Sequence, residues 1–196
     1  MGLIDQGYLS QALGICSIDK NETYMKLSMI TCPVTGTIGE YTVTKETTMK
    51  QIDTAQLDTA ACQAQAAEYH AQGFNCAQAV ACPLAPAAGL DPQTAFTLTE
   101  GFGAGMGGMT ETCGAISGAV AIMGFVMSDG MENPKTKGQT YKLSREIAKR
   151  FGEKNTTTVC GTLKGIGSDK GPLRSCPGCI DDAVEIACDV LKQLAE

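Results

Sequence analysis

Apolar residues recur every three or four positions along much of the chain, and the clearest case lies at its C-terminal end. This spacing predicts an amphipathic helix that begins at a Cys-Pro-Gly-Cys segment, with Pro177 suited to the first helical position. Its apolar face comprises Ile180, Ala183, Val184, Ala187, Val190, Leu191 and Leu194. The same spacing predicts a second helix over residues 141–151, ended by Gly152.

An unbroken apolar run from Cys113 to Met127 predicts a buried central helix, and a glycine-rich segment precedes it. Thr110 is its predicted N-cap, which places Cys113 in the first turn, where free amides and the helix dipole favour a thiolate. Gly114 and Gly118 lie on one face of this helix, so another group can approach the backbone closely there. The run is too short to span a bilayer comfortably, and no membrane insertion is expected.

Between residues 54 and 110 the pattern predicts three shorter helices. The first covers residues 54–72, and the second is capped by Asn75, has Cys76 in its first turn and is broken by Pro83 and Pro86. The third covers residues 93–99 after Asp91-Pro92, and a later short segment places Cys160 in another first turn.

The first 48 residues differ from the rest, because they show only a weak alternation over residues 37–44. We therefore expect an N-terminal extension over residues 1–48, poorly structured or with a short β segment, and a helical cysteine-motif domain over residues 49–196. The expected fold is all-α, a compact multi-helix domain around the glycine-rich central helix. The alternation of strands and helices that a doubly wound fold requires is missing.

Charge and composition narrow the function. The chain has 196 residues, a net charge of −6 and a pI near 4.8, which argues against a nucleic-acid partner. No basic region followed by an apolar stretch opens the sequence, so we expect a cytoplasmic, reducing compartment. Ten cysteines in such a compartment indicate metal binding or redox chemistry rather than a disulfide framework.

Several cysteines share a predicted position near the start of a helix: Cys76, Cys113, Cys160, and the pair Cys176 and Cys179. If these helix starts converge, their amides form an electropositive pocket suited to disulfide exchange or to an iron–sulfur cluster. In the Cys-x-x-Cys pair, the first thiol would be activated and the second would resolve a mixed disulfide. Cys62, Cys82 and Cys188 lie on helical faces and are expected to be small buried hydrophobes.

These residues resemble a known family. Residues 73–80, the glycine-rich run into residues 113–118, Val159-Cys160 and the late Cys176 are similar to the C_GCAxxG_C_C family, named for its four cysteines. The resemblance covers about residues 54–195, although this chain reads Cys-Gly-Ala-Ile-Ser-Gly where the name has GCAxxG, and Cys179 could replace Cys176 as the last motif cysteine. It implies a small helical, redox-active protein.

The combined prediction is a redox-active protein, either an enzyme or an electron carrier, that works with a redox partner protein or a small thiol or disulfide. The alternatives are an iron–sulfur cluster held by four thiols, thiol–disulfide exchange, or a non-catalytic metal-binding or interaction module. The predicted catalytic residues are Cys76, Cys113, Cys160, Cys176 and Cys179, of which the first four are also the predicted metal ligands. The predicted cofactor-binding residues are Gly105, Gly107, Gly108, Gly114 and Gly118. The sequence leaves the oligomeric state open, a homo-oligomer included.

Overall fold

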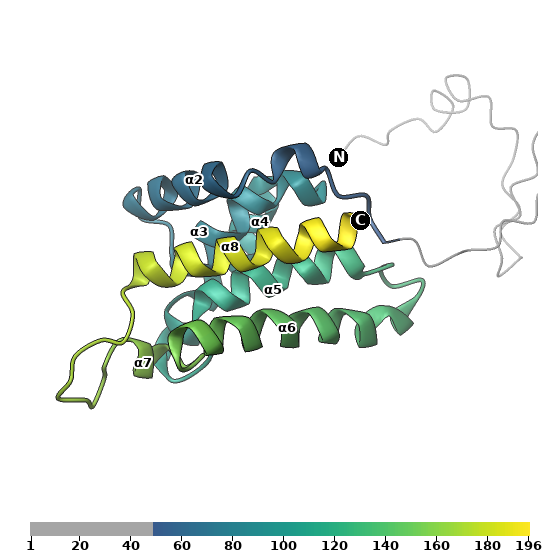
Figure 1. Cartoon of the computed structure of the whole chain (residues 1–196). Helices are drawn as coiled ribbons and strands as arrows, with labels where there is room; N and C mark the ends of the chain where they lie inside the picture. The colour runs from purple at the N-terminus through teal and green to yellow at the C-terminus, as the bar shows by residue number, and fades with distance from the viewer. Residues whose placement is uncertain (1–48) are drawn as a thin grey trace, which may run out of the picture. The chain divides into compact units, whose positions relative to one another are not determined.

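The computed structural model describes residues 49–196, and all the regular elements in this part of the chain are helices (Figure 1). The α-helices are α2 (Thr59–Ala71), α3 (Cys76–Leu84), α4 (Pro92–Thr99), α5 (Gly114–Met127), α6 (Lys137–Asn155), α7 (Cys160–Leu163) and α8 (Cys176–Ala195). The shorter turns are η1 (Thr54–Gln56), η2 (Pro86–Ala88), η3 (Glu100–Phe102), η4 (Gly105–Met109) and η5 (Pro134–Thr136). The predicted all-α class is confirmed, whereas the predicted N-terminal extension with its short β segment lies outside the described residues.

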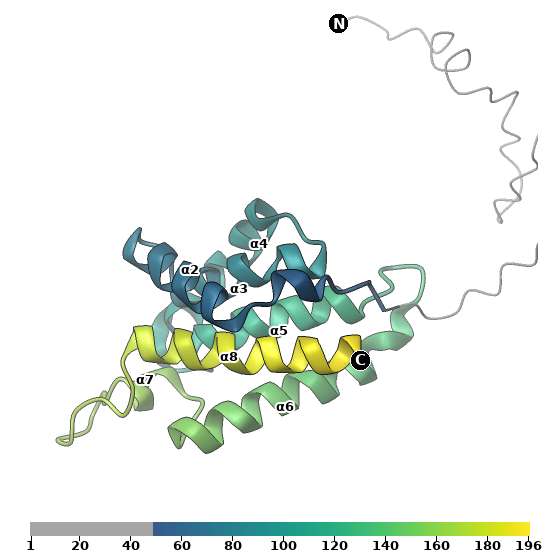
Figure 2. The ribbon, with the colours of Figure 1, turned by 45° about the horizontal axis from the view of Figure 1, so that its top comes forward.

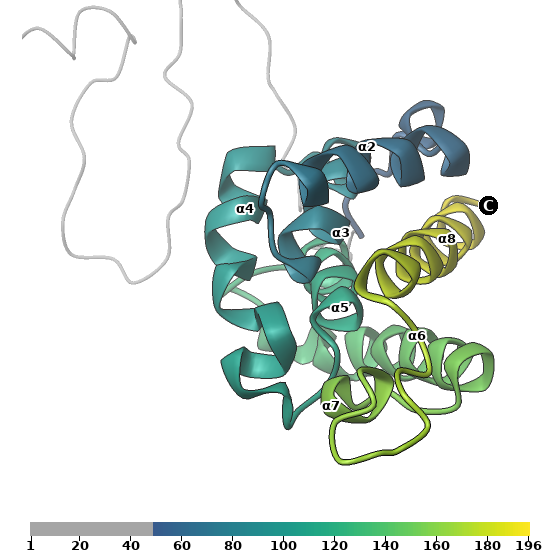
Figure 3. The ribbon, with the colours of Figure 1, turned by 90° about the vertical axis from the view of Figure 1, so that its left-hand side faces the viewer.

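The glycine-rich helix α5 is central, as predicted. Figure 3 shows α5 surrounded by α3, α4, α6 and α8, and each of these four helices packs against it. A Cβ at Gly118 would overlap the backbone carbonyl of Ala77 in α3, so the missing side chain allows the two helices to touch. The close approach expected at this glycine is therefore an approach by another helix.

The predicted start of α5 is wrong, because Thr110 does not cap it. The helix begins at Gly114, and Cys113 is its N-cap residue rather than part of the first turn. Residues 111–113 are instead extended along residues 158–160, with an isolated antiparallel bridge between Thr112 and Val159. This pairing joins segments distant in sequence, so the local pattern could not reveal it.

Other helix boundaries also differ from the sequence prediction. The predicted helix over residues 54–72 is divided, because Asp58 caps α2 separately through bonds from Ala60 N and Ala61 N. Gly152 does not end α6, which continues to Asn155 and is followed by Thr156 with a φ of 75°. Asn155 is buried beside Asp182, and this packing extends the buried face of the helix past the glycine.

Pro83 does not end the second predicted helix where the sequence indicated. Pro83 lies inside α3, which continues to Leu84 before Pro86 opens η2. A proline this close to the end of a helix removes only one backbone hydrogen bond, so the last turn persists. Asp91 caps α4 as predicted, and its carboxylate accepts a bond from Thr94 N at 2.9 Å.

The C-terminal helix matches the predicted pattern. In α8 the N-cap is Ser175, whose hydroxyl accepts a bond from Gly178 N at 3.2 Å, and Pro177 is the second helical residue. Figure 2 shows α8 alongside α2 and α6, running in the direction opposite to α2. Among the helices of residues 49–196, none is both long enough and apolar enough to cross a bilayer.

Candidate functional site

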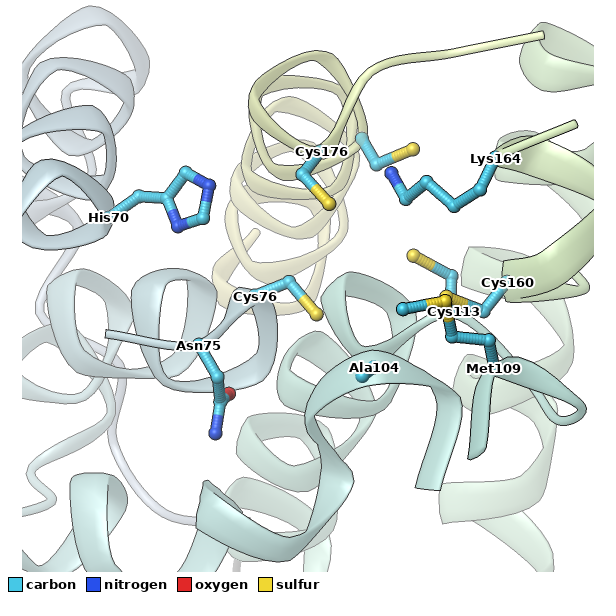
Figure 4. Close-up of a pocket in the computed structure, with 10 residues that line it drawn as sticks. His70, Asn75, Cys76, Ala104, Met109, Cys113, Cys160, Lys164 and Cys176 are labelled. Carbon is cyan, nitrogen blue, oxygen red and sulfur yellow. The ribbon is translucent and has the colours of Figure 1, made fainter. Parts of the chain in front are cut away.

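Four helices begin around one cavity. Cys76, Cys160 and Cys176 are the first residues of α3, α7 and α8, and Cys113 is the N-cap of α5. All four line a cavity of about 190 Å³ together with Cys179 (Figure 4). Its remaining lining residues are His70, Asn75, Ala104, Met109 and Lys164. The structure thus brings together all five cysteines that the sequence singled out.

Asn75 fixes the start of α3 and therefore the position of Cys76. Its side-chain oxygen accepts bonds from Ala77 N at 2.9 Å and Gln78 N at 3.0 Å, and the Gln78 side chain accepts from Asn75 N at 3.0 Å. This reciprocal arrangement is a capping box. The Asn75 amide also donates to the carbonyl of Glu100 at 2.8 Å, which ties the helix start to the segment before the glycine-rich loop.

The pairing before α5 brings Cys113 and Cys160 to the same cavity. Cys113 N donates to Thr158 O at 2.8 Å, and Cys160 N donates to Glu111 O at 2.9 Å. The glycine-rich loop lies against this pair, because a Cβ at Gly105 would be 2.6 Å from the Cβ of Cys160. Gly105 has a φ of 54°, so the backbone conformation and the close contact both favour glycine here.

The loop that lines the cavity also contains non-glycine residues in the left-handed region. Ala104, Met106 and Met109 have φ values of 49°, 59° and 58°. Such conformations are costly for residues with a side chain and occur preferentially at ligand clamps and active sites. Ala104 and Met109 line the cavity itself, which makes this loop part of the candidate site.

Three of the thiols form a hydrogen-bonded series. The Cys76 thiol donates to Cys113, and the Cys113 thiol donates to Cys179. The bond to Cys179, together with burial, raises the pKa of Cys113 to about 12. The sequence-based expectation that the Cys113 thiolate forms easily is therefore wrong, because this thiol acts as a donor to its neighbour.

Cys179 is the acceptor at the end of this series. The hydrogen bond from Cys113 lowers the pKa of Cys179, and the positive charge of Lys164 acts in the same direction, while burial opposes both. Cys76 and Cys160 behave differently. Donation to Cys113 raises the pKa of Cys76, and burial raises the pKa of Cys160.

Lys164 is a site residue that the sequence analysis missed. In the part of the chain that the structure describes, its ammonium nitrogen is buried and has no hydrogen-bond partner that meets normal geometry. Figure 4 shows the side chain pointing into the cavity near Cys176. Burial alone would lower the pKa of Lys164, but the adjacent Cys176 sulfur raises it. A single lysine before Gly165 matches no sequence motif, so only the fold reveals that Lys164 lines the cavity.

The glycines predicted to bind a cofactor do not share one environment. Gly114 is packed against Cys76, where a Cβ would lie 2.5 Å from Sγ, whereas Gly107 and Gly108 are exposed. A cofactor-binding role for the five glycines stays a prediction. Thiols are suitable ligands for iron or zinc. However, across residues 49–196 no three Cys, His, Asp or Glu side chains are grouped closely enough to hold a metal ion.

Comparison with known proteins confirms the family resemblance that the cysteine motifs indicated. The model of the family described as "Putative redox-active protein (C_GCAxxG_C_C)" matches residues 74–190. No curated protein and no solved structure matches the chain. The matched segment contains every cysteine that lines the cavity and more than half of the 196 residues, so the chain belongs to the C_GCAxxG_C_C family of redox-active proteins.

Proposed function

We propose that the protein exchanges electrons with a disulfide-bearing partner through the thiols of this cavity. The observation that carries the proposal is the convergence of five thiols from four segments of the chain around one cavity. Isolated buried cysteines can be explained by packing alone, but packing does not require thiols to meet one another. The partner is a redox protein or a small disulfide.

The Cys176 and Cys179 pair is the proposed point of exchange. The two residues are three positions apart in the first turn of α8, so their side chains lie on neighbouring positions of one helix face. Cys176 is half-buried, whereas Cys179 is fully buried. An incoming disulfide would therefore meet Cys176 first, and Cys179 would resolve the intermediate.

The exchange is a two-electron reaction. The Cys176 thiolate attacks one sulfur of the partner disulfide, the partner's S–S bond breaks, and its second sulfur leaves and takes up a proton. The Cys179 thiolate then attacks Cys176, an intramolecular disulfide forms, and the first partner sulfur leaves as a thiol. The partner disulfide is reduced to two thiols while the two cysteines are oxidised.

Lys164 supports this assignment. Its ammonium group lies beside Cys176, and its positive charge lowers the pKa of Cys179. A positive charge next to a buried sulfur favours the thiolate, which is the nucleophilic form. The series through Cys113 to Cys76 places two further thiols beside the pair.

Trapping the mixed disulfide tests the proposal. In Cys179→Ser, treatment with glutathione disulfide should leave glutathione bound to Cys176, because the resolving thiol is absent. Cys176→Ser should not form this adduct, and Cys82→Ser, which alters a buried cysteine outside the cavity, should behave as the wild type. Mass spectrometry of the intact proteins reads out all three. Wild-type protein whose Cys176 and Cys179 stay unpaired throughout a glutathione redox titration would contradict the proposal.

An iron–sulfur cluster is the second candidate, favoured by the number of thiols around one cavity. Cys76, Cys113, Cys160 and Cys176 would be its ligands, and the donor chemistry is suitable. Within residues 49–196 these thiols are not grouped closely enough to hold a metal ion, so we derive no step through a cluster. Anaerobic purification with iron and acid-labile sulfide analysis tests it, because a cluster should be lost in Cys113→Ser.

A further inference from the structure

The packing of α2 against α8 brings together two cysteines that the cavity does not use. The helices run antiparallel (Figures 1 and 2), and Lys192 Nζ donates to Thr59 Oγ1 at 2.9 Å across their interface. In an antiparallel pair, a residue nearer the C-terminus of one helix faces a residue nearer the N-terminus of the other. Cys62, three positions after Thr59, and Cys188, four positions before Lys192, are therefore the next facing pair.

The two thiols are buried and in contact. Cys62 is 5% exposed and Cys188 is fully buried, and the Cys188 thiol donates a hydrogen bond to Cys62. The Cys62 thiol can in turn donate to the carbonyl of Gln56 at 3.6 Å. The contact lowers the pKa of Cys62 and raises the pKa of Cys188, so Cys62 is the thiol that ionises first.

We propose that Cys62 and Cys188 form a second dithiol site, which a peroxide oxidises to a disulfide that cross-links α2 to α8. The site is separate from the cavity, because Cys188 lies nine residues beyond Cys179 in α8, about 13 Å along the helix axis. Cys62 lies outside the segment that matches the family, and neither thiol is one of the four cysteines that the resemblance assigns.

The oxidation requires one peroxide molecule for each disulfide. The Cys62 thiolate attacks one oxygen of hydrogen peroxide, the O–O bond breaks, and a sulfenic acid forms with release of one water after protonation. Cys188 then attacks the sulfenic sulfur, the S–S bond forms, and a second water leaves. Two thiols lose two electrons and two protons, and the peroxide is reduced to two waters.

The cross-link would act on both walls of the thiol cavity. Near its C-terminal end α2 carries His70, and α8 begins with Cys176, and both residues line the cavity. A disulfide further along the same two helices would fix their relative position without occupying the cavity. It would also raise the thermal stability of the domain by constraining the unfolded chain.

Peptide mapping of the full chain tests this site. The reduced protein is treated with hydrogen peroxide, unfolded in the presence of N-ethylmaleimide and digested without reductant. The wild type should yield linked peptides that contain Cys62 and Cys188, and its melting temperature should rise by roughly 5 °C on oxidation and fall again on reduction. Cys62→Ser and Cys188→Ser should lose both effects, while Cys82→Ser, a buried cysteine outside this pair, should keep them.

The result in the wild type decides the proposal even if a variant folds poorly. Maleimide on both Cys62 and Cys188 after oxidation would overturn it, as would a disulfide from either residue to another cysteine. A double variant, Cys176→Ser with Cys179→Ser, separates this site from the cavity, because the linked peptides should persist there. Failure of electron exchange in the cavity therefore leaves this test unaffected.

Discussion

The Arg174 guanidinium donates two hydrogen bonds to the carboxylate of Asp182, at 2.9 and 3.0 Å. Asp182 is buried in α8 and also pairs with Lys154 of α6 at 2.9 Å. Arg174 lies over the first turn of α8, because a Cβ at Gly178 would be 2.5 Å from the Arg174 Nε. One carboxylate thus anchors the segment before α8, the Cys-x-x-Cys turn and the end of α6.

Replacing Asp182 should weaken this anchor. Asp182→Asn removes the charge that compensates two cations, and we expect a loss of roughly 2 kcal/mol in the free energy of unfolding at pH 7. Urea denaturation measures it. Asp181→Asn is the matched control, because Asp181 is the exposed neighbour in the same helix, and its effect should stay within about 0.5 kcal/mol.

The same carboxylate predicts a pH dependence. Burial would raise the pKa of Asp182, but hydrogen bonds from Lys154 and Arg174 outweigh it and hold the pKa below its ordinary value near 3.8. Its stabilisation is therefore present above that value and is lost as the pH falls through the lower, folded-state pKa. Between pH 6 and pH 3, the wild type should lose more stability than Asp182→Asn. Equal losses in both proteins would contradict this assignment.

Much of the helical fold could be predicted, because its signals are local. Asn75 before α3, Asp91 before α4 and the apolar face of α8 each depend on residues within one or two turns. The convergence of the cysteines was also predictable in outline, because each lies near a helix start that the sequence indicated, although the cap predicted for α5 was wrong. The family motif indicated the same four positions.

The sequence-based predictions failed where segments that are distant in sequence contact each other. The start of α5 depends on the bridge between Thr112 and Val159, and the end of α6 on the burial of Asn155 beside Asp182. The role of Lys164 and the lowered pKa of Cys179 depend on which groups face each other across the cavity. No pattern within a short window of sequence contains that information.

Gly118 provides a test of the helix packing behind the cavity. Gly118→Ala places a methyl group against the carbonyl of Ala77, and neither backbone can move without separating α3 from α5. We expect a loss of roughly 2–3 kcal/mol in unfolding free energy, measured by denaturant titration. Gly124→Ala in the same helix is the control, because the nearest atom to its Cβ is a Thr140 methyl at 4.0 Å. Its higher helix propensity should leave stability unchanged or raise it by up to about 1 kcal/mol.

Lys164 should control how readily the cavity thiols react. Lys164→Met keeps the length of the side chain but removes the charge that favours the Cys179 thiolate. Resolution of a mixed disulfide on Cys176, the step in which the Cys179 thiolate attacks, should slow roughly fivefold at pH 7, corresponding to about 1 kcal/mol. Lys164→Arg should retain most of the rate because it keeps the charge. A rate in Lys164→Met that equals the wild-type rate from pH 6 to pH 9 would show that the lysine has no electrostatic role.

Cys113 provides the most specific test of the thiol series, since serine and alanine separate its donor role from its size. Cys113→Ala removes the hydrogen bond that is the largest cause of the lowered pKa of Cys179, so the pKa of Cys179 should rise. Cys113→Ser keeps a hydroxyl donor in the same place and should lie closer to the wild type. The pH dependence of iodoacetamide labelling at Cys179, followed by peptide mass spectrometry, measures both. In the wild type, labelling should reach its half-maximal rate at a lower pH than in Cys113→Ala. Identical profiles for the wild type and Cys113→Ala would show that the Cys113 thiol does not lower the pKa of Cys179.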